Sequence, residues 1–169
     1  MGAGNNLGLK HIQTDYAFIL NPDVILESNT IDEIIHASSH LDSFAIVAPI
    51  SNNKNYPNYK LSKNQKINFD KDRPFRVMSV DGYAMVLNIK RLKNFEEFRD
   101  QNYFDENFFM YLENDDLCKN LVRLNQNIYI IPKSKINHLG GKATDVKYEY
   151  QIEMSRNWHW IWSKFYFNK

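Results

Sequence analysis

Three short segments of the sequence carry side chains that could do chemistry. Asn21-Pro22-Asp23 follows the apolar run 16–20, Asp81-Gly82 separates two apolar runs, and residues 113–116 read Glu-Asn-Asp-Asp. Polar residues at the carboxyl end of a buried strand occupy the position where α/β sheets bind ligands. Each segment also has a structural interpretation. Asn-Pro-Asp is typical of a turn, and carboxylates are favoured at a helix N-terminus.

The elements that would position these residues alternate between strand and helix patterns. Short apolar runs predict strands at 16–20, 44–48, 77–80, 84–88 and 127–131, with Pro49 and Pro132 closing two of them. Helical spacing is found at 5–13, 30–41, 116–124 and 148–165. Thr30 and Glu33 have the spacing of a capping box. Strands that alternate with helices predict an α/β layered domain.

Length and composition predict one globular domain spanning residues 1–169. The chain is 43% hydrophobic and has a net charge of +1, so no basic field indicates nucleic acid as a partner. The single cysteine, Cys118, is expected to be a small buried hydrophobe. No apolar run is long enough to span a membrane and no secretory signal is visible, which favours a cytoplasmic location. The polar stretch 51–73 is expected to be a functional loop or a lid.

Three segments, taken in order, resemble family 2 glycosyltransferases, and especially their rhamnosyltransferase-like branch. The first is Gly4-Asn-Asn-Leu-Gly8 with Tyr-Ala-Phe-Ile-Leu-Asn-Pro-Asp-Val at 16–24, and the second is Asp-Gly-Tyr-Ala-Met-Val-Leu-Asn-Ile-Lys-Arg at 81–91. The third runs from Phe104 to Cys118 and continues to Ile131-Pro132 and to residues 136–141, Ile-Asn-His-Leu-Gly-Gly. The resemblance implies a GT-A-like (Rossmann-like) mixed sheet flanked by helices. It also leads us to expect that the family's first strand-helix-strand unit is missing, which leaves the C-terminal two-thirds of such a domain.

The activity implied by this resemblance is inverting transfer of a sugar, such as rhamnose, from a nucleotide-diphosphate sugar. The acceptor would be a glycan or a lipid-linked molecule in surface polysaccharide synthesis. The family pattern makes Asp23 a ligand of Mg²⁺ or Mn²⁺, with His138 completing the metal site. Asn21, Asp23, Asp81 and Gly82 are the implied donor-binding residues. As alternatives, His138 could be a surface or capping histidine and Gly82 a turn glycine.

The general base is the point at which this sequence departs from the family. The usual base position is occupied by Asn114, whose amide cannot accept a proton. Glu113 and Asp116 are the preferred replacements, ahead of Asp115. The aromatic residues Phe108, Phe109 and Tyr111 are expected to wall the acceptor pocket, or else to belong to the core.

Two further questions remain open at the level of the sequence. The departure at Asn114 and the missing first unit are compatible with a catalytically degenerate sugar- or partner-binding domain, or with half of a split transferase. The tail 148–167 combines three tryptophans with basic residues. It could lie on the inner face of a membrane, or it could pack on the domain or on a partner subunit in an oligomer.

Overall fold

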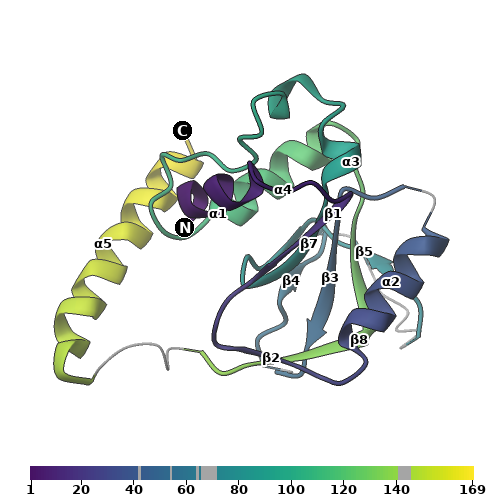
Figure 1. Cartoon of the computed structure of the whole chain (residues 1–169). Coiled ribbons are helices and arrows are strands. Elements are labelled where there is room, and N and C mark those ends of the chain that lie inside the picture. The colour runs from purple at the N-terminus through teal and green to yellow at the C-terminus, as the bar shows by residue number, and fades with distance from the viewer. Residues whose placement is uncertain (42, 54, 64, 66–71, 141–145) are drawn as a thin grey trace.

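The structure is a computed structural model that describes residues 1–41, 43–53, 55–63, 65, 72–140 and 146–169. Figure 1 shows a central sheet with helices on both sides and one long helix at the edge of the molecule. The helices are α1 (Gly2–Leu9), α2 (Thr30–His40), α3 (Ile89–Leu92), α4 (Glu113–Arg123) and α5 (Glu149–Phe167). Short 3₁₀ turns cover Glu96–Phe98 and Val146–Tyr148. The strands are β1 (Tyr16–Leu20), β2 (Val24–Leu26), β3 (Ile46–Ser51), β4 (Tyr59–Lys60), β5 (Phe75–Arg76), β6 (Ser79–Val80), β7 (Ala84–Asn88) and β8 (Ile128–His138).

The main sheet is mixed, and most of its neighbouring strands are antiparallel. Its strand order is β1-β7-β3-β8-β2, and β5 also pairs with β8. The β3–β8 pairing is parallel, whereas β1–β7, β3–β7, β2–β8 and β5–β8 are antiparallel. A separate two-stranded ladder joins β4 to β6. The expected mixed α/β sheet flanked by helices is therefore confirmed.

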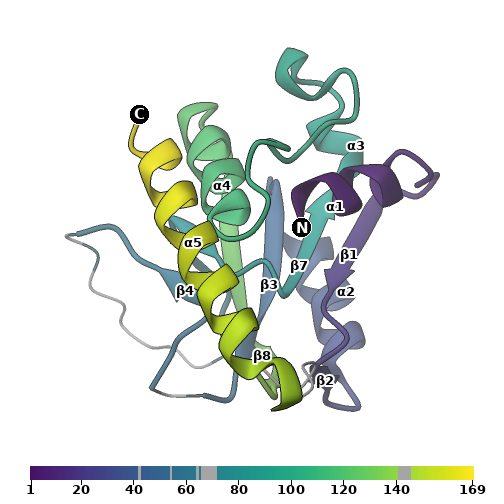
Figure 2. The same cartoon turned by 90° about the vertical axis from the view of Figure 1, so that its left-hand side faces the viewer.

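Side chains of the central strands alternate between two apolar clusters, one on each face of the sheet. On β3, Ile46 and Ala48 enter the larger cluster, whereas Val47 joins the smaller cluster beneath α2. This alternation follows from the two-residue period of a strand. The larger cluster includes Leu117 and Leu121 of α4. Figure 2 shows α4 and α5 on the opposite side of the sheet from α2, and the Lys119 ammonium of α4 lies over the ring of Phe167 at the end of α5. The apolar residues of the sheet thus fix the position of the α4 N-terminus.

Two strands run past the prolines that were expected to end them. β3 contains Pro49 and β8 contains Pro132, so the predicted strands 44–48 and 127–131 were too short. The β3–β8 register shifts between Pro49 and Ile50, whose partners are Ile131 and Lys135. Because proline has no N–H to donate to the ladder, it is tolerated at such an irregularity. The extension carries β8 to His138.

Helix boundaries also differ from the sequence predictions. The predicted capping box at Thr30 is wrong, because Asn29 is the N-cap and the Thr30 hydroxyl donates to the Lys135 carbonyl oxygen at 2.6 Å. α1 occupies Gly2–Leu9 rather than 5–13, and α4 begins at Glu113 rather than Asp116. Within the described part of the chain, no helix is long and apolar enough to cross a membrane.

Residues 51–73 lie only partly within the described structure. Positions 54, 64 and 66–71 fall outside it, so the predicted lid is not tested there. Gly141, the last glycine of the family-like His138 segment, also lies outside the described residues. The described part of 51–73 contains β4, which contributes Lys60 to the site below.

Candidate functional site

A cavity of about 690 Å³ brings together residues from all three family-like segments. Asn21 follows β1, Asp81 and Gly82 follow β6, Glu113 opens α4, and His138 ends β8. The far wall comes from Arg156 and Trp160 of α5, shown in yellow in Figure 2. Residues more than a hundred positions apart therefore face one space.

The loop carrying Asp81 is held by a buried amide. The side chain of Asn58 donates to the Pro49 carbonyl oxygen at 2.8 Å and accepts from the Ser51 N–H at 2.9 Å. The backbone carbonyl of Asn58 accepts from the Asp81 N–H at 2.9 Å. Pairing of Lys60 with Ser79 in the β4–β6 ladder extends the same support. Asp81 is thus positioned by backbone contacts, which leaves its carboxylate available to the cavity.

Three carboxylates, those of Asp81, Glu113 and Asp115, share the cavity with Lys60. The Lys60 ammonium donates to Asp115 Oδ2 at 2.6 Å, although most of the lysine side chain is exposed. Burial raises the pKa of Asp81, and the nearby Asp115 carboxylate raises it further, while Lys60 and His138 act in the opposite direction. Because Asp115 is already paired with a cation, it is less available to accept a proton than Glu113, whose Oε2 has no hydrogen-bond partner among the described residues.

Glu113 combines burial with an unused acceptor atom. Its side chain is 3% exposed, and its Oε2 has no hydrogen-bond partner among the described residues. Burial raises the pKa of this carboxyl, its own backbone N–H lowers it, and Asp115 adds a smaller increase. A carboxyl group that lines a cavity with a raised pKa has the properties of a general base.

The two residues before Glu113 have unusual backbone conformations. Tyr111 has a φ of 70° and Leu112 a φ of 65°, and both line the cavity. A left-handed conformation is unfavourable for residues with a Cβ atom. Two successive residues nevertheless adopt it here, immediately before α4. Such backbone strain clusters at functional sites.

Asp23 and His138 meet because β2 pairs with β8. Val24 is the register partner of His138, and Asp23 Oδ2 lies 3.3 Å from His138 Nε2. The His138 ring stacks on Tyr83 with a centroid separation of 3.9 Å, and burial raises the pKa of Tyr83 to about 12. The two residues predicted to hold the metal are therefore adjacent. Within the described residues, no group of three or more His, Cys, Asp or Glu side chains could hold a metal ion.

Gly82 lines the first cavity and also packs closely against α4. A Cβ atom at Gly82 would lie 3.2 Å from the Cβ of Asn114. The Asn114 amide in turn donates to the Val80 carbonyl oxygen at 2.7 Å. Gly82 therefore allows close approach of α4, which Asn114 anchors, and it also lines the first cavity, where its predicted role in donor binding stays a prediction.

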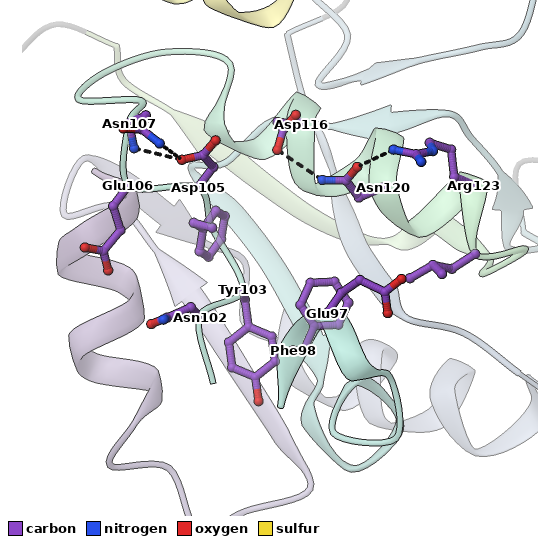
Figure 3. Close-up of a pocket in the computed structure, with 12 residues that line it drawn as sticks. Glu97, Phe98, Asn102, Tyr103, Asp105, Glu106, Asn107, Asp116, Asn120 and Arg123 are labelled. Atoms are coloured by element: carbon purple, nitrogen blue, oxygen red, sulfur yellow. Dashed lines mark hydrogen bonds between the residues drawn. The ribbon is translucent and has the colours of Figure 1, made fainter. Parts of the chain in front are cut away.

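Asp116 faces a different cavity from Glu113. This second cavity, of about 650 Å³, also contains Asp105, Asn120 and Arg123 (Figure 3). Asn120 donates to Asp116 Oδ2 at 3.1 Å. Burial raises the pKa of Asp116, and Asp105 adds to this effect. The structure therefore separates Asp116 from Asn21, Asp81 and His138, so the predicted catalytic role of Asp116 has no geometric support.

The three aromatic residues predicted to wall the acceptor pocket have different environments. Phe108 is a core side chain that packs edge-on against Tyr166. Phe109 is exposed and stacks on His159. Only Tyr111 of these three lines the first cavity, where its ring meets Trp160 edge-on. Phe108 thus follows the alternative, structural interpretation.

Several residues of the cavity were not predicted as site residues, although their segments were noted in the sequence analysis. Lys60 lies in an irregular polar stretch, and Arg156 and Trp160 belong to a tail distant from the motifs. Tyr83 lies inside a family-like segment but was not singled out, although it stacks on the predicted ligand His138. Cys118 is fully buried and burial raises its pKa to about 12, which confirms it as a core residue.

Comparisons with known proteins assign no family. No protein-family model matches the chain. None of the curated proteins matches it. A solved structure, "Crystal Structure of A197 from STIV", is similar with a TM-score of 0.48 and 11% identity, covering 77% of this chain and 60% of that chain. The chain thus spans less than two-thirds of the length of this neighbour, and a likeness at this level carries no functional argument.

Proposed function

We propose that the protein is an inverting glycosyltransferase with a GT-A-like site, which moves a sugar such as rhamnose from a nucleotide-diphosphate donor to a glycan or lipid-linked acceptor. One observation carries this proposal. Asn21, Asp81, Glu113 and His138, which come from all three family-like segments, line one cavity. A cavity of about 690 Å³ is in the range that small-molecule and cofactor sites occupy.

Asp23 and His138 are the residues that would hold a divalent cation in this site. Their facing atoms are 3.3 Å apart, so both could turn to one ion. The Asp23 carboxylate suits Mg²⁺ or Mn²⁺, which take their remaining oxygens from water and substrate phosphates, and the His138 imidazole would be a supplementary ligand. When bound, such an ion neutralises charge on the departing diphosphate.

Glu113 is our choice for the general base. In an inverting displacement, the acceptor oxygen forms a bond to the anomeric carbon while the bond from that carbon to the diphosphate oxygen breaks. The bonding electrons leave with the diphosphate, and the acceptor proton passes to the Glu113 carboxylate. The unpartnered Oε2 of Glu113 supports this role, since the atom has no competing hydrogen bond among the described residues. Arg156, across the cavity, supplies positive charge for an anionic donor.

The proposal is tested by assaying sugar release or transfer from a panel of nucleotide-diphosphate sugars, with and without Mn²⁺. We expect metal-dependent turnover that Asp23→Ala reduces by at least about a hundredfold, an effect of the size seen when groups that stabilise a transition-state charge are removed. Asp15→Ala is the matched control, because Asp15 is an exposed carboxylate that pairs with the exposed Lys90. Equal turnover by wild type and Asp23→Ala would refute the metal assignment.

A second function is supported by the environment of Asn114. Its amide is committed to the Val80 carbonyl oxygen, so the family's base position has a structural role in this chain. A domain that binds a nucleotide sugar without turning it over would show donor binding, no transfer in the presence of any acceptor, and no effect of Glu113→Gln on binding.

A further inference from the structure

Helix α5 is amphipathic, but its apolar side faces away from the domain and its more polar side packs against it. The residues on its docked face, which lie against the domain, are largely polar or amphipathic: Ile152, Arg156, His159, Ser163, Tyr166 and Phe167. The residues on its outward face form an apolar stripe, each of them exposed: Tyr150, Met154, Trp158, Ile161, Trp162 and Phe165. Both sets recur at spacings of three and four residues, with Ile161 and Trp162 adjacent in the stripe, as expected for two faces of one helix.

The docked face is fixed by specific contacts, so the orientation of the stripe follows from them. The buried Ser163 hydroxyl donates to the Met110 carbonyl oxygen at 2.6 Å. The Tyr166 hydroxyl donates to Asp105 Oδ2 at 2.9 Å. One turn of the helix away, the His159 ring stacks on Phe109 with a centroid separation of 4.4 Å. Rotating α5 to bury the stripe would break these contacts.

A contiguous apolar face of this kind indicates an interaction surface. Single exposed apolar side chains are normal on a protein, but six large ones on one helix face are not accounted for by the domain. Figures 1 and 2 show α5 along the outside of the molecule, with no other element over its outer side.

We propose that the apolar stripe of α5 docks on a membrane surface that carries anionic lipids. The charge pattern supports this partner, because Glu149 and Glu153 lie in the first turns of α5, whereas the exposed basic residues Lys164 and Lys169 lie at its end, where residues 154–169 contain no aspartate or glutamate. Basic residues beside an apolar helix face are the signature of helices that lie in the headgroup region. Trp158 and Trp162 add the aromatic residues that prefer the membrane interface.

This surface is continuous with the candidate site. Arg156 and Trp160, on the inward side of α5, line the first cavity. The helix therefore separates the cavity from the membrane by its own width, and a lipid-linked acceptor would reach the cavity past α5. The docking inference stands on α5 alone; only this last consequence rests on the proposed function.

Vesicle binding tests the proposal without any sugar substrate. All three tryptophans of the chain, at 158, 160 and 162, lie on α5, so tryptophan fluorescence, excited selectively over that of the ten tyrosines, reports on this helix. Vesicles of phosphatidylglycerol and phosphatidylcholine should shift the emission to shorter wavelength and carry the protein into the pellet. Pure phosphatidylcholine should bind at least about tenfold more weakly, since each basic residue near an anionic surface contributes about 1 kcal/mol.

The matched variants separate the stripe from other exposed apolar residues. Ile161→Ser with Phe165→Ser keeps every tryptophan and removes two side chains that are 65% and 72% exposed. It should lower vesicle binding by more than about tenfold, given the transfer free energy of two such side chains. The control is Ile25→Ser with Ile35→Ser, which changes residues that are 53% and 62% exposed elsewhere and should bind as wild type does.

A charge variant keeps the test decisive should the apolar variant lose its fold. Lys164→Glu with Lys169→Glu should abolish the preference for phosphatidylglycerol, whereas Lys90→Glu on α3 should not. Absence of binding to anionic vesicles at low salt would overturn the proposal. So would a concentration-dependent dimer in sedimentation that Ile161→Ser with Phe165→Ser dissociates, because a second copy would then cover the stripe. Vesicle binding without sugar transfer would contradict only the proposed function.

Discussion

The two cavities on either side of α4 contain similar residue types but differ in how those residues are used. In the first cavity, Glu113 has an oxygen without a partner among the described residues, and the backbone before it is strained. In the second, Asp116 accepts from Asn120 and Asp105 accepts from Asn107 (Figure 3). Asp105 also accepts from the Tyr166 hydroxyl. Successive residues on a helix point about 100° apart, so neighbouring carboxylates serve different spaces. The presence of carboxylates therefore does not identify an active site, and it is the oxygen without a partner among the described residues that makes Glu113 our candidate base.

The largest expected effect is the contrast between Glu113→Gln and Asp116→Asn. Removal of a general base costs about a hundredfold or more in turnover, so Glu113→Gln should lower kcat by at least that factor. Asp116→Asn should stay within a few-fold of wild type, because Asp116 faces the second cavity. Steady-state kinetics with the same donor measures both. A larger loss in Asp116→Asn than in Glu113→Gln would reverse the assignment of the two cavities.

The next effect concerns the contact that supports the first cavity. Gly82→Ala would place a methyl group 3.2 Å from the Cβ of Asn114, and overpacking of this kind costs about 1–3 kcal/mol. Asn114→Ala loses the hydrogen bond to Val80, at about 1 kcal/mol. Urea unfolding of both single variants and the double variant measures the coupling. Because Asn114→Ala keeps its Cβ, it should relieve only part of the Gly82→Ala penalty. Full additivity would show that the two residues do not interact.

A pH effect distinguishes Glu113 from an exposed glutamate. Burial raises the pKa of this carboxyl in the folded state. The folded protein then holds a proton that the unfolded chain has lost, so this group's contribution to stability falls as the pH rises from the unfolded pKa through the folded pKa. Glu113→Gln should flatten that part of the stability curve and gain relative stability at neutral pH. Thermal melts at several pH values above 4 measure the slope, and an unchanged slope would contradict a raised pKa.

The smallest expected effect is that of Lys60→Met. The Lys60–Asp115 pair is short, but the lysine is mostly exposed, so solvent screening limits its contribution to stability to a few tenths of a kcal/mol. Donor affinity is the more sensitive readout, because Lys60 lines the first cavity. Lys90→Met, at another exposed pair, is the control. A loss of stability above about 1 kcal/mol would show that the pair is structural.

The strands and helices followed from local patterns, whereas their pairing did not. The run 16–20 is strand β1 as expected, because an apolar run stopped by Asn21-Pro22 has one simple interpretation. Pro49 was expected to end a strand, but a register shift against β8 accommodates it. Thr30 had the spacing of a helix cap, but its hydroxyl donates a hydrogen bond to the carbonyl oxygen of Lys135 on β8, more than a hundred residues away. Long-range partners of this kind leave no trace in a local window.

The candidate site was predicted in part, for the same reason. Asn21, Asp81, Glu113, Asp115, Tyr111 and His138 line one cavity, and Asp23 lies beside His138. Asp116 and Phe108 were grouped with them because sequence spacing does not show which side of a loop or helix a residue faces. Lys60 and Arg156 reach the cavity only through the tertiary fold.

Donor binding to the first cavity is the most direct test of the central claim. Isothermal titration calorimetry of the full chain with nucleoside diphosphates and their sugars, with and without Mn²⁺, measures it. We predict metal-dependent binding that Asp23→Ala removes and Asp15→Ala leaves unchanged. No binding of any nucleotide to a folded sample, or binding that is indifferent to both Mn²⁺ and Asp23, would contradict the assignment of this cavity as a nucleotide-sugar site.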